Sequence, residues 1–309
     1  MTSGVAVVSG GVGAARLLAG LVQVVPAGDL TAIVNVGDDV ELHGLHISPD
    51  LDTITYTVAG AIDPERGWGL AGETWHAMEA LARYPRARAW FNLGDRDLAT
   101  HLYRTDRLRA GATLAEVTAE VADAWGLPLR LLPVTNDRLQ TRVTVPGEGE
   151  IGFQEYFVQR QHDVAVEAVR FDGADGASPA PFVLDALQHA RRVVLAPSNP
   201  IVSIDPVLAV PGVRDAVVAR RGDAVAVSPI IAGAALKGPA DRLLRELGHE
   251  ASVVGVARLY APLVATLVID EADADQRSAV EAEGVRCVVA PTIMRGPVEA
   301  KALAEVVVA

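Results

Sequence analysis

Residues 5–21 read VAVVSGGVGAARLLAGL, a β-branched run followed by a glycine-rich turn and an apolar, helix-like stretch. Strand, glycine turn and helix in this order are typical of an α/β protein whose first loop approaches an anion. Gly10, Gly11 and Gly13 allow close backbone approach, and the unpaired N–H groups of the following helix favour negative charge. We therefore predict a phosphate-binding turn. It lacks the P-loop lysine and the glycine and acid spacing of a dinucleotide site, which argues against NAD.

Four further β-branched runs follow, each with a loop and a helix-like stretch after it: residues 31–36, 193–196, 224–227 and 285–289. Short apolar strands that alternate with helices predict a parallel sheet covered on both faces. We therefore predict a Rossmann-like α/β fold with a doubly wound, mostly parallel sheet.

The middle of the chain has a different pattern, which predicts a smaller α+β lobe. Residues 74–84 and 114–125 have helical periodicity, whereas residues 141–145 and 152–158 alternate around a Pro-Gly turn. A Gly/Ala/Ser/Pro-rich stretch at 173–181 is the candidate lobe boundary or mobile loop. We predict one catalytic unit over 1–309, with a core of about 1–60 and 182–309 and a lobe of about 61–181.

Composition narrows the class of protein. The chain has 309 residues, half of them hydrophobic, and a formal charge of −12, which argues against a nucleic-acid binder. No apolar run approaches the roughly 18 residues of a membrane span, and no export signal precedes the first strand. The single cysteine, Cys287, lies in an apolar run and is expected to be a buried hydrophobe. We expect a cytoplasmic protein with a small ligand, free of nucleic acid and membrane.

Two acidic motifs lie near the expected edge of the sheet. Asp38 and Asp39 end the segment Asn35–Asp39, where paired carboxylates suit a Mg²⁺ ion and where an Asx turn with a helix cap is the alternative. Asp50 and Asp52 lie in Ser48-Pro49-Asp50-Leu51-Asp52-Thr53. They could position an alcohol or a metal, or cap a helix that begins near Thr53. The residues alone leave both pairs of alternatives open.

Further polar segments follow downstream. Asn92-Leu93-Gly94-Asp95-Arg96-Asp97 has the alternating charges of a solvated, salt-bridged turn. Ala196-Pro197-Ser198-Asn199-Pro200 directly follows a predicted strand, and Ser198, Asn199 and Ser203 supply hydrogen-bonding groups there. Trp68, Trp75 and Trp90 are either core residues or the walls of an aromatic pocket.

In combination these loops resemble the 2-phospho-L-lactate transferase family of coenzyme F420 biosynthesis, from Val5 to about Val308. The segments that carry the resemblance are Ser9-Gly10-Gly11, Pro49-Asp50-Leu51-Asp52-Thr53, Leu93-Gly94-Asp95-Arg96-Asp97, Ala196-Pro197-Ser198-Asn199-Pro200 and Ser228-Pro229-Ile230. Two more segments, Arg66-Gly67-Trp68-Gly69 and Glu73-Thr74-Trp75-His76-Ala77-Met78, resemble the actinobacterial phosphoenolpyruvate transferase branch.

The resemblance implies an enzyme that transfers a phosphoenolpyruvyl or 2-phospho-L-lactyl group. The donor would be linked to guanosine diphosphate, the acceptor would be the hydroxyl of the deazaflavin Fo, and GMP would be released with the help of Mg²⁺. It also implies that Asp52 and Asn92 contact Fo, although relatives have a lysine or an acid in place of Asn92.

Residue chemistry and the resemblance together suggest roles for the other polar groups. Asp52 or Asp50 would accept or orient the Fo hydroxyl proton, and Asp38 or Asp39 would hold Mg²⁺. Gly10, Gly11 and Gly13 would bind the diphosphate. The guanosine side would contact Ser198, Asn199 and Ser203.

Two rival functions and several open points accompany this hypothesis. One rival is a non-catalytic nucleotide-sugar-binding regulatory protein of the same fold family, and the other is a nicotinamide-dependent oxidoreductase. Apolar residues between 259 and 268 suggest a possible homodimer. The sequence leaves open the choice of enolpyruvyl or lactyl donor, the oligomeric state, and which carboxylate binds Mg²⁺ and which accepts the proton.

Overall fold

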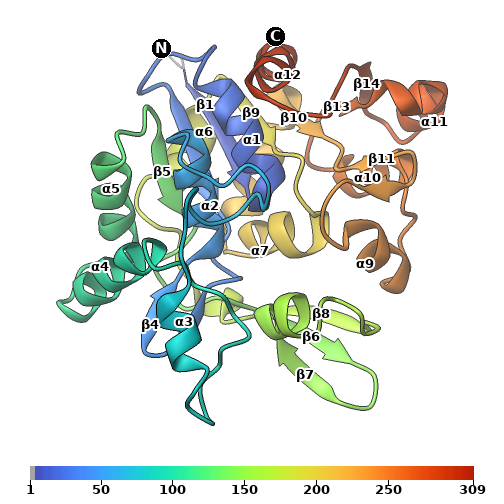
Figure 1. Ribbon diagram of the computed structural model, residues 1–309. Helices are drawn as coiled ribbons and strands as arrows, with labels where there is room; N and C mark the ends of the chain where they lie inside the picture. Colours follow the sequence, from blue (N-terminus) through green and yellow to red (C-terminus); the bar gives the residue numbers. More distant parts are fainter. Residues whose placement is uncertain (1–3) are drawn as a thin grey trace.

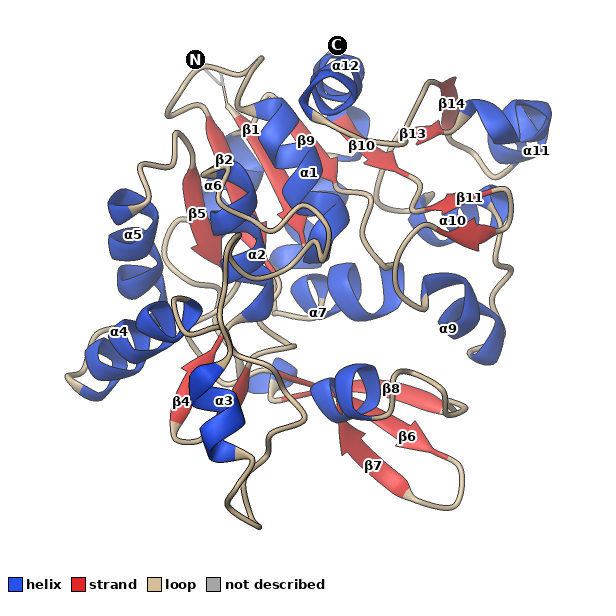
Figure 2. Ribbon diagram, in the orientation of Figure 1, coloured by secondary structure: helices blue, strands red, loops and turns tan. Residues whose placement is uncertain are grey.

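A seven-stranded parallel sheet forms the centre of the computed structural model, which describes residues 4–309 (Figures 1 and 2). The strand order is β14-β13-β10-β9-β1-β2-β5. Its strands are β1 (Val5–Ser9), β2 (Leu30–Val34), β5 (Arg130–Pro133), β9 (Arg192–Leu195), β10 (Ala224–Val227), β13 (Thr266–Ile269) and β14 (Arg286–Val289). Every residue of β1 and β10 is buried, as expected of a sheet without a solvated face.

The strand order reverses between β1 and β9. From β1 the chain proceeds outward to β2 and β5, whereas from β9 it proceeds in the opposite direction to β10, β13 and β14. Right-handed crossovers in opposite directions place the connecting helices on opposite faces, which confirms the doubly wound fold. Ligands of such sheets bind at this reversal, outside the carboxyl ends of the strands.

Helices cover the sheet on both faces. On one face α1 (Gly11–Leu21) packs between α2 (Pro49–Val58) and α12 (Pro297–Val308). The crossovers from β9 to β14 contain α7 (Asp205–Leu208), α8 (Val213–Ala219), α9 (Ala240–Glu246), α10 (Val253–Tyr260) and α11 (Arg277–Ala282), and α6 (Val183–His189) packs against α8. Among the described residues, no helix is both long and apolar enough to cross a membrane.

Short elements complete this half of the chain. They are the hairpin of β11 (Ile230–Ile231) and β12 (Ala234–Ala235), the π-helix η3 (Pro200–Ile204), and the 3-10 turns η4 (Arg221–Asp223) and η5 (Glu271–Gln276). Cys287 is buried in β14, in line with its expected role as a small hydrophobe.

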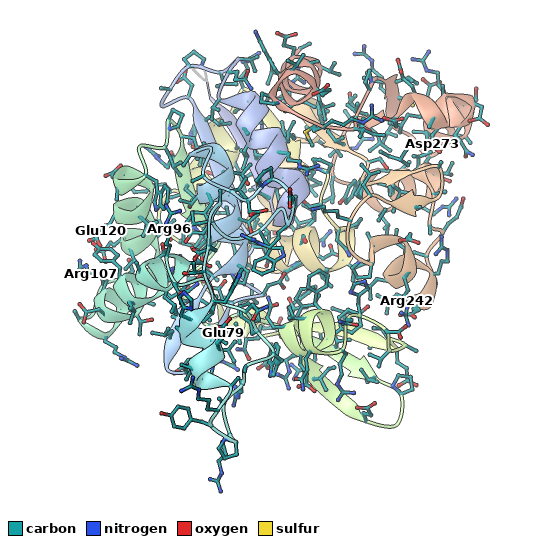
Figure 3. All side chains as sticks on the ribbon, in the orientation of Figure 1. Glu79, Arg96, Arg107, Glu120, Arg242 and Asp273 are labelled. Carbon is teal, nitrogen blue, oxygen red and sulfur yellow. The ribbon has the colours of Figure 1, made fainter. Side chains whose placement is uncertain are left out.

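Most of the remaining elements extend below the sheet in the view of Figures 1 and 2, while α5 (Leu114–Ala124) lies beside β5 at the left of the sheet. The others are the hairpin of β3 (Val40–Leu42) and β4 (Leu45–Ile47), helices α3 (His76–Leu81) and α4 (Asp97–Arg109), strands β6 (Gln140–Val145), β7 (Gly149–Gly152) and β8 (Ala168–Asp172), the π-helix η1 (Glu155–Gln159) and the turn η2 (Ala174–Gly176). Strands β7, β6 and β8 form an antiparallel sheet. Arg107 of α4 and Glu120 of α5 form an ion pair of 2.8 Å where these helices pack (Figure 3).

Two expected elements of this region need correction. The helix predicted over 74–84 is only α3, because Asp95 caps it at His76. The strand predicted over 152–158 is wrong, since β7 ends at Gly152 and η1 follows. There the ring of Phe153 contacts those of Tyr156 and Phe157, a helical spacing that competes with the alternation.

The lobe boundaries also change. Strand β5 lies inside the interval 61–181 assigned to the smaller lobe, yet it pairs with β2 at the edge of the central sheet. The segment 173–181 does connect β8 to α6, but it is tied down: Ser178 N–H donates to Asp137 at 2.7 Å, and Ala180 N–H donates to Val134. The chain therefore returns to the main sheet once before it forms β6 to β8.

Candidate functional site

The glycine turn lies at the reversal of strand order and is in close contact with other loops there. A Cβ atom at Gly10 would lie 2.8 Å from Ser203 Cβ, and one at Gly13 would lie 2.1 Å from the Pro197 carbonyl oxygen. Gly11 has a φ of 71°, in the left-handed region that favours glycine. The turn thus needs glycines for its fit against the loop after β9, in addition to any approach of a phosphate.

Asp50 is the acidic group at this turn. Its Oδ1 accepts a hydrogen bond of 2.9 Å from Gly11 N–H, at the start of α1. Its Oδ2 accepts one of 3.0 Å from the fully buried Asn35 side chain. Burial raises the pKa of Asp50 to about 7, although the hydrogen bonds from Asn35 and Gly11 oppose this shift. A carboxyl group with this pKa can accept or release a proton near neutral pH.

Asn35 was not among the predicted site residues, although it begins the acidic motif after β2. Its Nδ2 donates to Asp50, and its Oδ1 accepts a hydrogen bond of 2.7 Å from Gly37 N–H. It therefore holds the turn after β2 against the first turn of α2. A buried amide directly after a strand is the signal that could have identified it.

Asp38 and Asp39 lie beside this group and each has an unsatisfied oxygen. The Oδ1 atoms of both are buried without a hydrogen-bond partner in the described structure. Asp39 Oδ2 accepts hydrogen bonds from Ser48 Oγ at 2.7 Å and His46 Nε2 at 3.0 Å. Burial raises the pKa of Asp39, and burial together with the charge of Asp50 raises that of Asp38 well above its usual value.

A divalent cation fits the chemistry of these two carboxylates. Buried carboxylate oxygens without partners are ligands that Mg²⁺ accepts, and the cation would remove the repulsion between them. Residues 4–309 contain no group of three or more His, Cys, Asp or Glu side chains arranged around a metal ion. The protein could thus supply two ligands at most from this pair, and substrate or water oxygens would supply the rest.

Asp52 has a different environment from Asp50. Its two oxygens form a bidentate contact with Arg104 of α4, with 3.1 Å between Nη1 and Oδ2, and His101 Nδ1 lies 3.6 Å from Oδ2. All three side chains are buried. Residues two apart in a helix point in different directions, so Asp50 faces the glycine turn while Asp52 faces α4. The structure therefore favours a structural role for Asp52, whose buried ion pair with Arg104 fastens α2 to α4.

The residues of the motif 93–97 form hydrogen bonds that hold the ends of neighbouring helices, a role that its charge pattern did not suggest. Asp95 accepts hydrogen bonds from the N–H groups of His76 and Ala77 and so caps α3. In return, Glu73 accepts from Arg96 and Asp97 N–H at the start of α4. Figure 3 shows Arg96 and Glu79 of this region among the surrounding side chains.

Asp97 is buried, which corrects the expected solvated turn. Tyr56 donates a hydrogen bond of 2.6 Å to its Oδ1, and His101 Nε2 lies 3.4 Å from its Oδ2. Burial opposes the charged form, but His101, Tyr56 and Arg104 together hold the pKa of Asp97 below its usual value. The last residue of the motif thus belongs to the buried network around Arg104.

The predicted acceptor contact Asn92 is exposed in the loop before α4. Within the described chain no hydrogen bond joins it to Asp50 or Asp52. Of the nearby aromatic residues, Trp68 and Trp75 form a ring pair 5.8 Å apart, and the guanidinium of Arg66 lies over both. Trp90 instead contacts Phe91.

The loop after β9 makes mainly internal contacts. Ser198 Oγ donates a hydrogen bond of 2.7 Å to the Gly10 carbonyl, and Asn199 Oδ1 accepts one of 3.0 Å from Ile201 N–H at the start of η3. Ser203 packs against Gly10. The structure thus brings Ser198 and Ser203 to the glycine turn, where they hold its shape, whereas Asn199 caps η3, and the contact of all three with a nucleotide stays a prediction.

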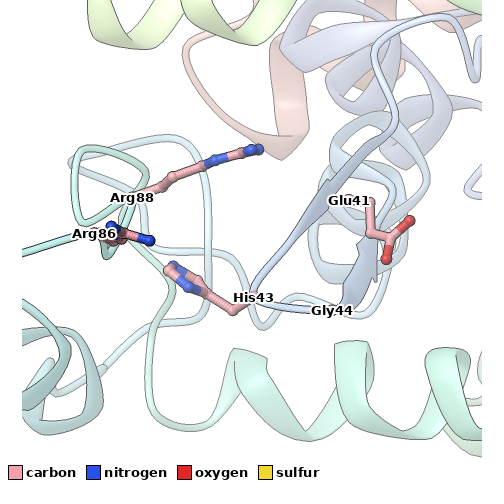
Figure 4. Close-up of a pocket in the computed structure, with 5 residues that line it drawn as sticks. All are labelled: Glu41, His43, Gly44, Arg86 and Arg88. Carbon is pink, nitrogen blue, oxygen red and sulfur yellow. The ribbon is translucent and has the colours of Figure 1, made fainter. Parts of the chain in front are cut away.

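Two other surfaces lie apart from the glycine turn. A hollow of about 470 Å³ lies at the tip of the β3–β4 hairpin, and Figure 4 shows the residues that line it, Glu41, His43, Gly44, Arg86 and Arg88. The apolar residues between 259 and 268 belong to the end of α10 and to β13 and are largely buried. That segment is therefore core and offers no apolar dimer surface, which corrects the basis of the homodimer prediction.

These features define an α/β protein with an acidic, glycine-lined ligand site at the switch point of its sheet. Residues 5–293 match the family model "2-phospho-L-lactate transferase CofD", and the chain belongs to this family.

Curated relatives extend over almost the whole chain. The chain is 46% identical to a phosphoenolpyruvate transferase of Nocardia farcinica over 299 residues, which cover 95% of this chain and 90% of that protein. It is 45% identical to the phosphoenolpyruvate transferase of Streptomyces coelicolor, with 94% and 92% covered. The corresponding Mycobacterium ulcerans protein is 44% identical, with 94% and 93% covered. The resemblance predicted from the motifs is thus confirmed, and the chain is a transferase of coenzyme F420 biosynthesis.

Solved structures support the fold. A crystal structure of protein BH3568 from Bacillus halodurans superposes with a TM-score of 0.65 at 14% identity and covers 99% of both chains. A second structure of that protein, described as a member of the UPF0052 family, gives a TM-score of 0.64 at 16% identity. At this identity the similarity bears on the fold alone.

Proposed function

We propose that this protein transfers a phosphoenolpyruvyl group from a guanosine diphosphate-linked donor to the hydroxyl of the deazaflavin Fo and releases GMP. Membership of the CofD family and the names of the actinobacterial relatives support this proposal. The 2-phospho-L-lactyl donor named in the family description is the alternative substrate. The cytoplasmic location also stays a prediction.

The observation that carries the mechanism is the position of Asp50. Its carboxyl group lies between the start of α1 and the Asn35 amide, next to Asp38, at the switch point. We assign to it the proton of the attacking Fo hydroxyl, because a carboxyl group near neutral pKa at this place can accept that proton. The hydroxyl oxygen then bonds to the distal phosphorus as the bond to the GMP phosphate breaks.

Asp38 and Asp39 would hold Mg²⁺, which supplies positive charge for the diphosphate when bound. Their unpaired Oδ1 atoms support this role. The two aspartates of α2 then have separate functions: Asp50 faces the reacting groups, while the pair between Asp52 and Arg104 keeps α2 in register with α4. Direct contact of Asp52 or Asn92 with Fo stays a prediction.

The test is incubation of the purified protein with Fo, Mg²⁺ and each guanylated donor in turn, followed by mass analysis of the products. We expect the enolpyruvyl donor to give an Fo adduct of matching mass and GMP in equal amounts. Asp50→Asn should slow this reaction by 10²-fold or more, the scale of general base catalysis, whereas the exposed Asp185→Asn should leave it unchanged. Donor binding without any GMP would refute the proposal and favour a regulatory binding protein.

A further inference from the structure

The chain has two lysines, Lys237 and Lys301, which are both exposed but differ in their polar contacts. Lys301 lies on the exposed side of α12, with its Nζ 4.0 Å from Glu305 Oε1. Lys237 follows the β11–β12 hairpin, and its Nζ donates a hydrogen bond of 3.3 Å to the carbonyl of Arg66. The described structure gives Lys237 no carboxylate partner.

Lys237 lies where three segments meet beside the glycine turn. A Cβ atom at Gly67 would lie 2.5 Å from Lys237 Nζ and 4.0 Å from a methyl group of Val12, in the first turn of α1. Gly67 has a φ of 72°, so a side chain there would be strained as well. The turn around Arg66 thus bridges the ammonium group and the start of α1.

Arg16, one turn further along α1, adds a second positive charge. Its Nη1 donates a hydrogen bond of 3.2 Å to the Met294 carbonyl, and within residues 4–309 no ion pair to a carboxylate is found for it. Burial, and after it the charge of Arg16, lower the pKa of Lys237. Arg66, by contrast, is neutralised by Asp63 at 2.9 Å.

Lys237, beside the first turn of α1, and Arg16, one turn further along the same helix, contribute positive charge near the helix N-terminus in a protein of net charge −12. Such an arrangement is unfavourable by itself and favourable once an anion lies between the charges. The only ligands of the proposed reaction with several negative charges in a row are the guanylated donor and its product.

We propose that Lys237, together with Arg16, binds the diphosphate of the donor and donates a hydrogen bond to the oxygen on which GMP departs. This inference rests on the proposed function. As the Fo oxygen bonds to the distal phosphorus, the bond between that phosphorus and the bridging oxygen breaks, and the bridging oxygen keeps the electron pair. Lys237 stays an ammonium ion throughout, and the hydroxyl proton goes to Asp50.

The competing explanation is that Lys237 only fastens the turn at Arg66. Lys237→Met keeps the apolar stem and removes the charge, Lys237→Arg restores a charge, and Lys301→Met is the matched control. We would measure the Kd for GDP at low and high salt, then kcat and KM for the guanylated donor, and the melting temperature. Lys237→Met should weaken GDP binding about 10- to 100-fold, the scale of a charge-assisted hydrogen bond.

The same variant should lower kcat and make GDP binding less dependent on salt, whereas Lys237→Arg should recover most of the affinity and Lys301→Met should match the wild type. A Lys237→Met protein that binds GDP normally but melts earlier would show a structural tether and overturn the inference. Loss of affinity for the donor alone, with GDP unaffected, would place the lysine on the donor's carboxylate and overturn it as well. Because GDP binding needs no turnover, a wild type that releases no GMP would refute the proposed function and leave the GDP titration to decide on Lys237.

Discussion

The replacement Asp50→Asn should make the protein more stable at neutral pH while it slows the transfer reaction. An unfolded chain ionises an aspartate near 3.8, whereas the folded protein keeps Asp50 protonated up to a pKa of about 7. Between these values the folded chain binds more protons than the unfolded chain, so the free energy of unfolding falls as pH rises. A carboxamide has the shape of the protonated carboxyl group and does not ionise. Its NH₂ group replaces one of the two oxygens that accept from Gly11 N–H and Asn35 Nδ2, so the variant also loses a hydrogen bond, at a cost of about 1–3 kcal/mol that does not change with pH.

The size of the effect follows from the same two values. The free energy difference between variant and wild type should grow by roughly 1.4 kcal/mol per pH unit from about pH 4 to about pH 7 and stay constant above. By about pH 8 this pH-dependent gain should reach up to about 4 kcal/mol, since Asp50 is buried and little screened by water, and it should exceed the cost of the lost hydrogen bond.

Urea unfolding followed by tryptophan fluorescence, in EDTA at several pH values, measures this difference. Asp52→Asn is the matched comparison, two residues away on α2. It leaves Arg104 buried and without its partner, so it should destabilise the protein by about 3–5 kcal/mol. An Asp50→Asn protein whose stability relative to the wild type does not rise between about pH 4 and about pH 7 would refute this account of Asp50.

Three further outcomes can be checked. Gly13→Ala should cost about 1–3 kcal/mol by overpacking in urea unfolding, whereas Gly176→Ala, with open space around it, should stay within about 0.5 kcal/mol. Asp39→Asn should raise the Mg²⁺ concentration for half-maximal transfer at least several-fold, and an unchanged Mg²⁺ titration would remove this residue from the metal site. Fo should quench the fluorescence of the Trp68–Trp75 pair, and a Trp68→Phe protein with undiminished quenching would place Fo elsewhere, because Trp68 is 41% exposed.

Periodicity and local motifs predicted much of the fold. The strands around Val5–Ser9 and Ala224–Val227 and the helix Leu114–Ala124 were readable because burial on both faces and helical spacing leave strong local signals. Strand β5 was missed because its short run lies between Pro128 and Pro133, and its partner β2 lies about a hundred residues earlier in the chain.

The position of the candidate site could be predicted from the sequence, whereas the roles of its individual residues were harder to predict. The edge of the sheet follows from strand order, so loops after β1, β2 and β9 had to meet. Asp50 and Asp52 looked equivalent in the sequence, because nothing local shows that Arg104, on a separate helix, neutralises only one of them. Asn35 was overlooked for a similar reason, since its partner Asp50 is defined only by the packing of α2.

The separation of the two aspartates has a consequence for how the site responds to ligands. Asp38, Asp39 and Asp50 all have raised pKa values because burial opposes their charges, whereas Asp52 and Asp97 are compensated by Arg104 and its neighbours. Asp38, Asp39 and Asp50 thus lie together near the glycine turn, and a cation that binds there would lower their pKa values. A bound Mg²⁺ would favour ionised Asp38 and Asp39 and so draw protons off them, while the same charge near Asp50 would prepare it to accept a proton. Metal binding and proton transfer at this site should therefore be coupled.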